Sequence, residues 1–451
     1  MGKHPETNDF EKKHSVRERQ WQTLNVKAEE FYLKLLSWGR GKSHFTVLHS
    51  GDFSKYTYPD DPSFQWMIAS DALEIFEWNE ESSLEAFQTF IDQSNDWIFG
   101  GLGYDLKNEM EDLSSHLPDE IEFPKAVFFV PKFIARAHVS GTVEVAFALS
   151  LSETQKQLYL KEVEELPLFK KEAIQGIHLA PRMHKSEYLE AISALKTHLK
   201  RGDIYEINYC QELFAQHVKV DPLQLWLRLS ETASAPFGAF LKWNEKSLVC
   251  GSPERYIKKS GNRLISQPIK GTAKRGEHAT QDTQIKTSLQ ADPKERGENV
   301  MIVDLVRNDF SRIAAKNSVE VDELFGVYSF PTVHQLISTV SCEVKEEVSF
   351  VEVLKASFPM GSMTGAPKVS AMQLAERYER SKRGLYSGSV GYIQPNGNFD
   401  FNVVIRALQY NAKSKVVSAI FGGAITDLSN PEKEYEESLL KAEAIQKSLK
   451  L

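Results

Sequence analysis

The sequence predicts an α+β protein whose strands pair antiparallel. Two strand-like segments, Tyr386–Gln394 and Asn398–Gln409, flank Pro395-Asn396-Gly397, which is a typical hairpin turn. Apolar residues at helical spacing run from Lys185 to Arg201, and Gly202 follows as a C-terminal cap. Helical and strand segments follow one another irregularly along the chain. This order argues against the regular β-α-β alternation of a parallel sheet.

Apolar spacing and turn residues define the remaining elements in chain order. Helices are predicted at Ala28–Trp38, Leu84–Asn95, Pro222–Ala233, Phe350–Ala356 and Pro431–Lys447. Glu153–Lys171 is predicted as a helical crossover or a linker, and Lys286–Ala315 as one long helix or a helix pair. Strands are predicted at Phe45–His49, Trp66–Ile75, Phe123–Ile134, Val143–Leu149, Tyr205–His217, Phe237–Val249 and Val416–Phe421. Residues 1–25 are polar and predict a loosely held N-terminal arm, and the charged segment Glu153–Lys171 marks the expected boundary between an N-terminal region and the rest.

Composition limits the class of protein. A net charge of -8 over 451 residues argues against nucleic-acid binding, which needs a basic face. Cys210, Cys250 and Cys342 are far apart and form no Cys-x-x-Cys pair, which excludes a disulfide scaffold and fits a reducing cytoplasm. The N-terminus has no apolar core typical of a signal peptide, and no apolar run is long enough to span a bilayer. We therefore expect a cytoplasmic protein that binds neither membrane nor nucleic acid.

Two pairs of glutamates have the spacing of candidate metal ligands. Glu295 and Glu298 are three residues apart on a predicted helix, so their carboxylates share one face. Glu434 and Glu437 repeat this spacing on the C-terminal helix, with Lys441 one turn further along. Oxygen ligands of this kind suit Mg²⁺. The alternative is two solvated helix faces, which is the commoner outcome for any single pair.

A lysine and a glutamate are candidates for catalysis. Lys270 follows a proline-stiffened run and precedes a Gly-Thr turn, and Glu254 lies in a turn-prone Ser-Pro-Glu-Arg segment. Lys270 would need a pKa depressed by burial to act as a neutral nucleophile. Glu254 would need an apolar wall that raises its pKa to act as a general acid. The alternatives are a surface lysine and an ordinary turn carboxylate.

Two glycine-containing segments could bring backbone N–H groups close to an anion. They are Gly361–Lys368, which lacks the Walker spacing, and Gly422-Gly423-Ala424 at the end of a predicted strand. Each taken alone is better explained as a glycine turn without a ligand. The residues together indicate a Mg²⁺-assisted enzyme that acts on a small carboxylate.

These motifs together resemble the chorismate-utilising enzyme family, which includes anthranilate synthase component I, aminodeoxychorismate synthase component I and the isochorismate and salicylate synthases. The matching stretches are Gly202–Asn208, Ser252–Glu254, Pro268–Thr272, Glu298–Leu305, Pro359–Lys368, Arg383–Tyr386, Arg406 and Gly422–Lys441. The resemblance is strong over residues 182–447 and weaker over residues 26–175. It implies that both regions are intertwined in one unit, with two facing β-sheets wrapped by helices and the active site in the cleft between the sheets.

Three positions distinguish the branches of this family. A lysine at the position of Lys270 is typical of the branch that aminates chorismate at C4, whereas the other branches usually have alanine. Gln335 stands where anthranilate synthases carry a histidine that is implicated in aromatisation. Glu206 replaces both the lysine base of the isochorismate synthases and the glutamine common in the aminating branches, so its local hydrogen bonding stays open. The alternative within the family is anthranilate synthase component I of tryptophan biosynthesis.

The resemblance also implies a mechanism and a set of roles. Lys270 adds at ring C2 while Glu254 protonates the departing C4 hydroxyl, and ammonia then enters at C4 and expels the lysine. The residues implied to bind Mg²⁺ are Glu298 and Glu437, supported by Glu295 and Glu434; those implied to bind chorismate are Thr272, Tyr386, Arg406, Gly422, Gly423, Ala424 and Lys441.

Partners follow from the same resemblance. A separate glutamine amidotransferase subunit would deliver ammonia, so the chain is expected as a monomer or as a heterodimer with that subunit. The product, 4-amino-4-deoxychorismate, would feed 4-aminobenzoate and folate biosynthesis. Some relatives bind tryptophan near the position of Ser50. A catalytically silent sensor or scaffold is the alternative outside enzymes, but none of Glu254, Lys270, Glu298 and Glu437 is lost.

Overall fold

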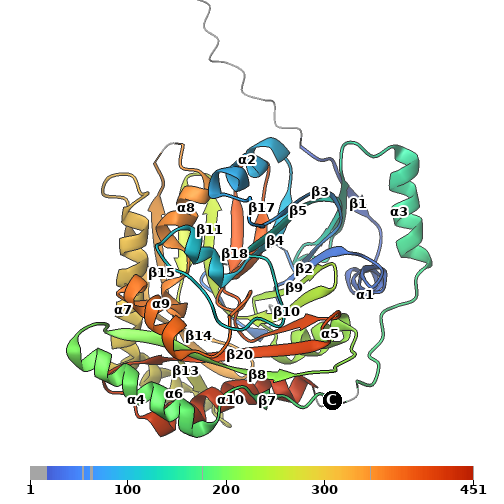
Figure 1. Cartoon of the computed structure of the whole chain (residues 1–451). Coiled ribbons are helices and arrows are strands. Elements are labelled where there is room, and N and C mark those ends of the chain that lie inside the picture. Colours follow the sequence, from blue (N-terminus) through green and yellow to red (C-terminus); the bar gives the residue numbers. More distant parts are fainter. Residues whose placement is uncertain (1–17, 53–54, 61–63, 175, 346, 450–451) are drawn as a thin grey trace, which may run out of the picture.

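The computed structural model describes residues 18–449 apart from 53–54, 61–63, 175 and 346 (Figure 1). Most of the predicted N-terminal arm, residues 1–17, lies outside the described residues. The remainder of the arm is not loosely held, which corrects that prediction. Trp21–Leu24 forms strand β1, which pairs with β6 (Val143–Phe147), and the Arg19 guanidinium forms an ion pair with Asp96.

The strands form one continuous antiparallel sheet with two halves. The first half runs in the order β8 (Glu206–Ala215), β20 (Val416–Ile425), β19 (Ala407–Asn411), β10 (Lys246–Ser252), β9 (Phe237–Trp243), β2 (His44–His49), β3 (Trp66–Glu77), β5 (Ala126–Ala137), β6 and β1. The second runs from β5 through β4 (Ile98–Leu102), β17 (Ser389–Ile393), β18 (Phe399–Asn402), β11 (Arg255–Ser260), β12 (Arg263–Gln267) and β15 (Val333–Glu343) to β14 (Glu320–Ser329). Three further strands complete it: β13 (Ile269–Lys274) beside β15, and β7 (Ala180–Pro181) and β16 (Gly365–Ala366) beside β8.

Strand β5 joins the two halves of the sheet. One edge of β5 pairs with β3, while its other edge pairs with β4 near Phe129 and with β6 near Phe133. Side chains from both halves, such as Leu241 on β9 and Phe99 on β4, are buried in the same apolar cluster. The two halves therefore face one another. The expected pair of facing layers is confirmed, although hydrogen bonds connect the layers into one sheet.

Helices cover the outer faces of both layers (Figure 1). The first layer buries apolar residues against α1 (Ala28–Gly39), α3 (Glu153–Glu165) and α5 (Pro222–Ala233). The second packs against α2 (Leu84–Ser94), α7 (Pro293–Ser311) and α8 (Phe350–Ser357). Around β8, β13 and β20 lie α4 (Lys185–Arg201), α6 (Ala279–Ala291), α9 (Lys368–Tyr378) and α10 (Pro431–Leu449). Short 3₁₀ turns span Tyr104–Glu109 and Gly361–Met363. None of the helices within the described residues is both long and apolar enough to cross a membrane.

Strands from the two predicted regions alternate within this sheet. β2 of the N-terminal region pairs with β9 of the C-terminal region, with Val47 opposite Phe240. β4 likewise pairs with β17, with Gly100 opposite Gly391. The segment after α3 is anchored to the first helix, because the Phe169 backbone N–H donates to the Leu33 carbonyl. Residues 26–175 and 182–447 therefore share one sheet.

Several predicted elements were wrong in their boundaries. Segment Phe237–Val249 is the hairpin β9–β10, because Asn244 turns the chain with a φ of 53°. Segment Lys286–Ala315, predicted as a long helix or a helix pair, is a pair: α6 begins earlier than predicted, at Ala279, and ends at Ala291, and α7 follows from Pro293 to Ser311. The expected strand Asn398–Gln409 is interrupted between β18 and β19. At this interruption the chain passes from the second half of the sheet to the first, and Arg406 lies in the connecting segment.

Candidate active site

The predicted site residues gather where the chain passes between the two layers. Glu254 lies in the connection from β10 to β11, and Arg406 lies in the connection from β18 to β19. Lys270 is on β13 of the second layer, and Gly422 is on β20 of the first. The helices that carry the glutamate pairs, α7 and α10, contact β13 and β20 respectively. The site therefore draws on both layers.

A bulge in β13 presents Lys270. The register against β15 is regular at Ile269 and again at Thr272, but it shifts between them. Gly271 has a φ of 100°, a backbone conformation that glycine adopts without steric cost. A Cβ there would lie 3.1 Å from Glu295 Oε2, so glycine also lets α7 approach the strand. The Pro-Ile-Lys-Gly-Thr motif thus brings the backbone that follows Lys270 close to a predicted metal ligand.

Lys270 is held by a buried carboxylate. Its Nζ donates to Glu206 Oε1 at 2.8 Å, and the two side chains are 12% and 2% exposed. Burial alone would lower the pKa of Lys270, but the attraction of Glu206, with help from Glu298 and Glu254, outweighs it and raises the pKa. The prediction of a depressed pKa is therefore wrong for the free protein, because Glu206 stabilises the ammonium form.

Glu254 is a buried carboxyl at the crossing from β10 to β11. Its backbone N–H donates to Ser252 Oγ at 3.1 Å, and its carbonyl accepts from the Val403 N–H. Burial raises the pKa of Glu254 to about 7, while Ser362, Lys270 and Arg406 act in the opposite direction. A pKa in this range lets the carboxyl carry its proton near neutral pH. This is the shift that the sequence-based hypothesis required.

The two glutamate pairs belong to helices that bring them into mutual electrostatic reach. Burial raises the pKa of Glu298 to about 7, and repulsion by Glu206 and Glu295 adds to this effect. Burial likewise raises the pKa of Glu295, to which Glu437 contributes by repulsion. Glu434 is buried on α10, one turn before Glu437. The site thus gathers more negative charge than its own cations neutralise.

Two lysines partly offset this charge. Lys294 Nζ lies 3.7 Å from Glu298, and Lys441 Nζ lies 2.9 Å from Glu437 and donates to the Gly422 carbonyl at 3.0 Å. Burial opposes ionisation of Glu437, yet the Lys441 ammonium outweighs it and lowers the pKa of that carboxyl. Within the part of the chain that the structure describes, no three or more His, Cys, Asp or Glu side chains form a metal-binding group. Lys294 was not predicted, although its position four residues before Glu298 on one helix could have indicated the contact.

Carboxylates whose negative charge is only partly offset by neighbouring lysines are ligands that fit Mg²⁺. This ion commonly takes one or two protein carboxylates and completes its shell with water and substrate oxygens, so a closed protein cage is not needed. The raised pKa values of Glu295 and Glu298 show that a cation would stabilise both in their ionised form. The residues present therefore fit the predicted metal.

Arg406 and Tyr386 provide the groups that suit a substrate anion. Burial lowers the pKa of Arg406, with Glu254 opposing, and no hydrogen bond or ion pair holds its guanidinium among the described residues. Burial raises the pKa of the Tyr386 hydroxyl, which keeps it protonated, and a hydrogen bond from the Gly422 backbone opposes the shift. A partly buried guanidinium without a carboxylate partner is a strong site for an anion. Binding of the substrate by these two residues stays a prediction.

The glycines of β20 allow close packing against β8. A Cβ on Gly422 would lie 2.6 Å from Cys210 Sγ, and one on Gly423 would lie 3.7 Å from Glu434 Oε2. Ala424 pairs with Asn208 next to them. Thr272 is exposed on β13, opposite the buried Gln335 of β15. The other glycine-containing segment, Gly361–Lys368, contacts β8 and the residue before it: the Thr364 carbonyl accepts from the Asn208 N–H, and the Ala366 carbonyl accepts from the Tyr205 N–H.

Ser50 lies apart from this cluster, at the end of β2. It lines a small cavity between the layers, together with Leu48, His49, Phe237, Tyr392 and Asn402. The cavity volume is about 40 Å³. Tryptophan binding near Ser50 stays a prediction.

Comparisons with known proteins identify the family of this chain. A family model described as chorismate binding enzyme matches residues 50–447. The chain is 30% identical over 424 residues to aminodeoxychorismate synthase component 1 of Bacillus subtilis, covering 91% of this chain and 87% of that protein. It is 35% identical over 370 residues to the chloroplastic aminodeoxychorismate synthase of Arabidopsis thaliana, covering 76% of this chain but 39% of the plant protein. The match to a probable rice counterpart covers 29% of that protein, so the chain spans well under half of these plant relatives.

Solved structures share the fold. Anthranilate synthase component I from Streptococcus pneumoniae superposes with a TM-score of 0.77 at 22% identity, covering 94% of this chain and all of that one. The menaquinone-specific isochorismate synthase from Escherichia coli gives a TM-score of 0.73 at 17% identity, covering 96% and 95% of the two chains. At this identity the likeness shows the architecture alone, whereas the family model spans most of the sequence. This chain belongs to the chorismate-binding enzyme family.

Proposed function

We propose that this protein aminates chorismate at C4 to give 4-amino-4-deoxychorismate. The observation that carries the proposal is Lys270, a buried lysine placed in one electrostatic cluster with Glu254 and Glu298. Aminodeoxychorismate synthases from Bacillus subtilis and Escherichia coli, 30% and 38% identical over their matched segments, support it.

The cluster supplies the chemical groups that this reaction needs. The Lys270 amine adds to ring C2, which forms a C–N bond, while Glu254 gives its proton to the C4 hydroxyl that leaves as water. Ammonia then bonds at C4 and the lysine departs as an amine. A pKa of about 7 for Glu254 suits this donor role near neutral pH. Arg406 and Tyr386 would hold the enolpyruvyl carboxylate.

Glu298 and Glu437 would hold Mg²⁺, with Glu295 and Glu434 supporting them through water. When bound, the metal would neutralise the ring carboxylate of the substrate and draw electron density from the diene. Gly423, Ala424 and Lys441 would complete the contacts to this carboxylate. The low steric bulk of Gly423 beside Glu434 and Lys441 supports that placement.

Ammonia would come from a separate glutamine amidotransferase. Free ammonia is scarce at neutral pH because its conjugate acid predominates, so a delivering subunit is needed. The functional unit would be the monomer supplied with ammonium, or a heterodimer with the amidotransferase. Its product would serve 4-aminobenzoate and folate biosynthesis.

The test is an incubation of the purified protein with chorismate, Mg²⁺ and a high ammonium concentration near pH 8.5. We expect a non-aromatic amino product that yields 4-aminobenzoate only after a lyase is added. Lys270→Ala should abolish this product, whereas Lys274→Ala, an exposed lysine on the same strand, should leave it. Release of anthranilate and pyruvate would instead identify the alternative, anthranilate synthase component I, and would contradict the proposed role of Lys270.

A further inference from the structure

Glu206 is fixed at the first position of β8 by an unusually close backbone approach. It pairs with Ala366 of β16, and the preceding Gly365 has a φ of 144°. A Cβ on Gly365 would lie 2.2 Å from the Glu206 carbonyl oxygen, so only glycine allows this contact. The glycine-containing segment Gly361–Lys368 thus helps to position the Glu206 residue of the protein itself.

The Glu206 carboxylate has one oxygen on Lys270 and one without a partner. Oε1 accepts from Lys270 Nζ at 2.8 Å, whereas Oε2 is buried and has no hydrogen-bond partner among the described residues. Both oxygens of a buried carboxylate normally accept hydrogen bonds. A carboxylate with one oxygen lacking a hydrogen-bond partner retains capacity to accept a proton. The other charged groups of the cluster that act on Lys270 or on its neighbours are Glu254, Glu298, Glu295 and Glu437, together with Lys294 and Arg406.

We propose that Glu206 is the catalytic base that takes the proton Lys270 must lose before its amine can attack the substrate. This inference rests on the proposed function, in which Lys270 is the nucleophile. An N–H bond of the Lys270 ammonium breaks and an O–H bond forms on Glu206, without oxidation or reduction. Glu206 holds the proton while the lysine is bonded to the ring. It returns the proton when the lysine departs as a free amine, so the resting ion pair is restored.

Neither neighbouring carboxylate suits this task as well. Glu254 must reach the reaction already protonated, because it gives its proton to the departing hydroxyl. Glu298 is assigned to the metal, which needs the carboxylate ionised. Within the described chain, Glu206 is also the one carboxylate that forms an ion pair with Lys270. Transfer inside this pair releases no proton to solvent, which gives the proposal a measurable signature.

The test compares Glu206→Gln with the wild-type protein in the absence of ammonia. Chorismate and Mg²⁺ are supplied, and intact-protein mass follows the rate at which an adduct of chorismate minus water appears on Lys270. Glu212→Gln is the matched control, since Glu212 is a buried carboxylate on the same strand that bonds Ser418 and Arg182 instead. A separate acylation of Lys270 across a pH series gives its pKa in each variant.

The informative quantity is the ratio of the Glu206→Gln rate to the wild-type rate, because the contribution of Glu254 is common to both and cancels. At pH values below the pKa measured for Lys270 in the variant, Lys270 of the variant must first lose a proton to solvent. In the wild type the same proton passes to Glu206 instead. We expect this ratio to rise roughly tenfold for each pH unit. The Glu212→Gln ratio should stay level.

A ratio that does not change with pH, or a variant rate within threefold of wild type throughout this range, overturns the role of Glu206. Absence of any adduct on wild-type Lys270 contradicts the proposed function instead, because the nucleophile itself is then misassigned. The acylation measurement checks in either case that the variants are folded and that Lys270 is accessible.

Discussion

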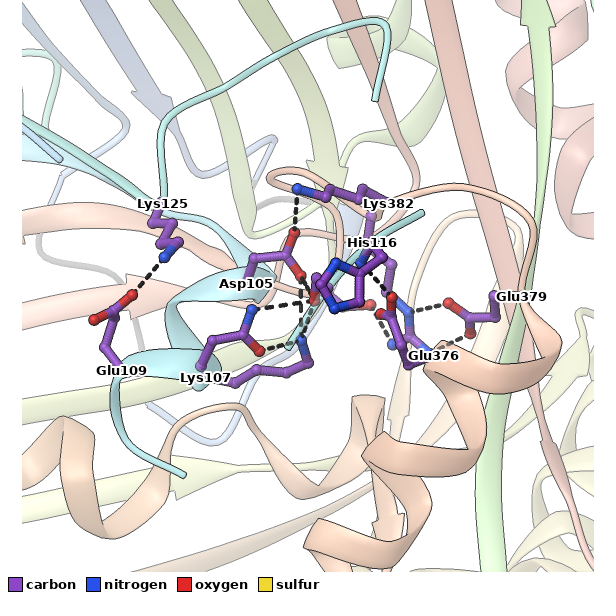
Figure 2. A network of polar contacts seen from close by, with 12 residues as sticks. Asp105, Lys107, Glu109, His116, Lys125, Glu376, Glu379 and Lys382 are labelled. Atoms are coloured by element: carbon purple, nitrogen blue, oxygen red, sulfur yellow. Dashed lines mark hydrogen bonds and ion pairs between the residues drawn. The ribbon is translucent and has the colours of Figure 1, made fainter. Parts of the chain in front are cut away.

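Two buried groups of charges in this protein differ in how completely they are paired. Around Arg383, which follows α9, every guanidinium N–H has an acceptor: Nε and Nη2 donate to Glu379, and the others donate to Met363 O, Ser387 Oγ and Asn208 O. Nearby, Lys107 donates to Asp105, Asn108 and Ser115 (Figure 2). Around Lys270, by contrast, three carboxylates face one ammonium group, and Glu206 Oε2 has no partner among the described residues.

The difference separates a structural role from a chemical one. A buried charge that is fully hydrogen-bonded holds segments together, and here Arg383 ties Glu379 to the Met363 and Asn208 carbonyls. Next to it, Lys382 forms an ion pair with Asp105 of the turn at Tyr104–Glu109 (Figure 2). A buried cluster with more carboxylates than cations keeps some of its carboxyl groups protonated near neutral pH. It lowers the stability of the fold until a cation or substrate binds. Composition alone does not distinguish the two groups, because both contain Lys, Arg and Glu.

The largest expected effect is on catalysis. Glu254→Gln removes the proton donor and should lower the rate of chorismate amination by about 10²–10⁴-fold. Equilibrium binding of chorismate should change little, because the amide keeps the shape of the side chain. The rate is measured with saturating ammonium, and Glu245→Gln, an exposed residue in the β9–β10 turn, is the control. A loss of less than threefold would remove Glu254 from the mechanism.

The fully paired group should show its importance in stability instead. Arg383→Met leaves Glu379 as a buried charge without its cation, and the free energy of unfolding should fall by about 3–5 kcal/mol. Urea denaturation measures this change. Arg380→Met, at an exposed position three residues earlier, should stay within about 0.5 kcal/mol of wild type. Equal stability of both variants would mean that the Arg383 network contributes little.

A smaller effect concerns the pH dependence of stability. The pKa of Glu254 is about 7 in the folded protein, raised by burial from 4.5. Its contribution to stability is therefore full below pH 4.5 and is lost as the pH rises through 7. The glutamine of Glu254→Gln cannot ionise. The free energy of unfolding of this variant, relative to wild type, should therefore rise by about 1–3 kcal/mol between pH 5 and pH 8. Urea titrations at both values test this, and a constant difference would place the pKa of Glu254 near its ordinary value.

The smallest effect should appear at the glutamate pairs. Lys294 lies 3.7 Å from Glu298 and would compete for that carboxylate with the Mg²⁺ that we propose binds there. Lys294→Ala should lower the Mg²⁺ concentration for half-maximal amination by about two- to fivefold, as expected for a partly exposed ion pair. Lys286→Ala on α6 is the control, because this lysine is exposed. An unchanged or higher Mg²⁺ requirement would show that Lys294 does not oppose metal binding.

Local sequence signals predict the helices of this fold well. Gly202 ends α4, and Pro222 begins α5, where the sequence indicates. The Pro395-Asn396-Gly397 turn joins β17 and β18, which pair antiparallel as expected. Strands β14 and β15 were not predicted, because β14 is mostly exposed or half-buried and β15 is buried along nearly its whole length, so neither shows a clear alternation. β15 is placed by its pairing with β12 and β13, and β14 by its pairing with β15, which no local pattern reports.

The proposed catalytic groups were likewise predicted only where a local motif marks them, and their long-range contacts were not. Motifs identify Lys270, Glu254 and the glutamate pairs, since each has a recognisable local setting. The contact between Lys270 and Glu206 joins residues 64 positions apart, and sequence reasoning could note Glu206 only as an unusual residue. The pKa of Lys270 was consequently predicted in the wrong direction. Burial was foreseeable from the motif, but the charge that outweighs it is brought by the tertiary fold.

The alternation of strands from both ends of the chain also bears on how the protein is made. β2 lies beside β9, and β4 lies beside β17, which ends at Ile393. Until the ribosome has released β9 and β17, strands β2 and β4 each lack one neighbour, and those edges remain open to other chains. Such long-range pairing also slows folding, because distant segments must meet before they gain contacts. We therefore expect the chain to depend on chaperones during synthesis, and to complete its sheet and its active site together, late and after translation.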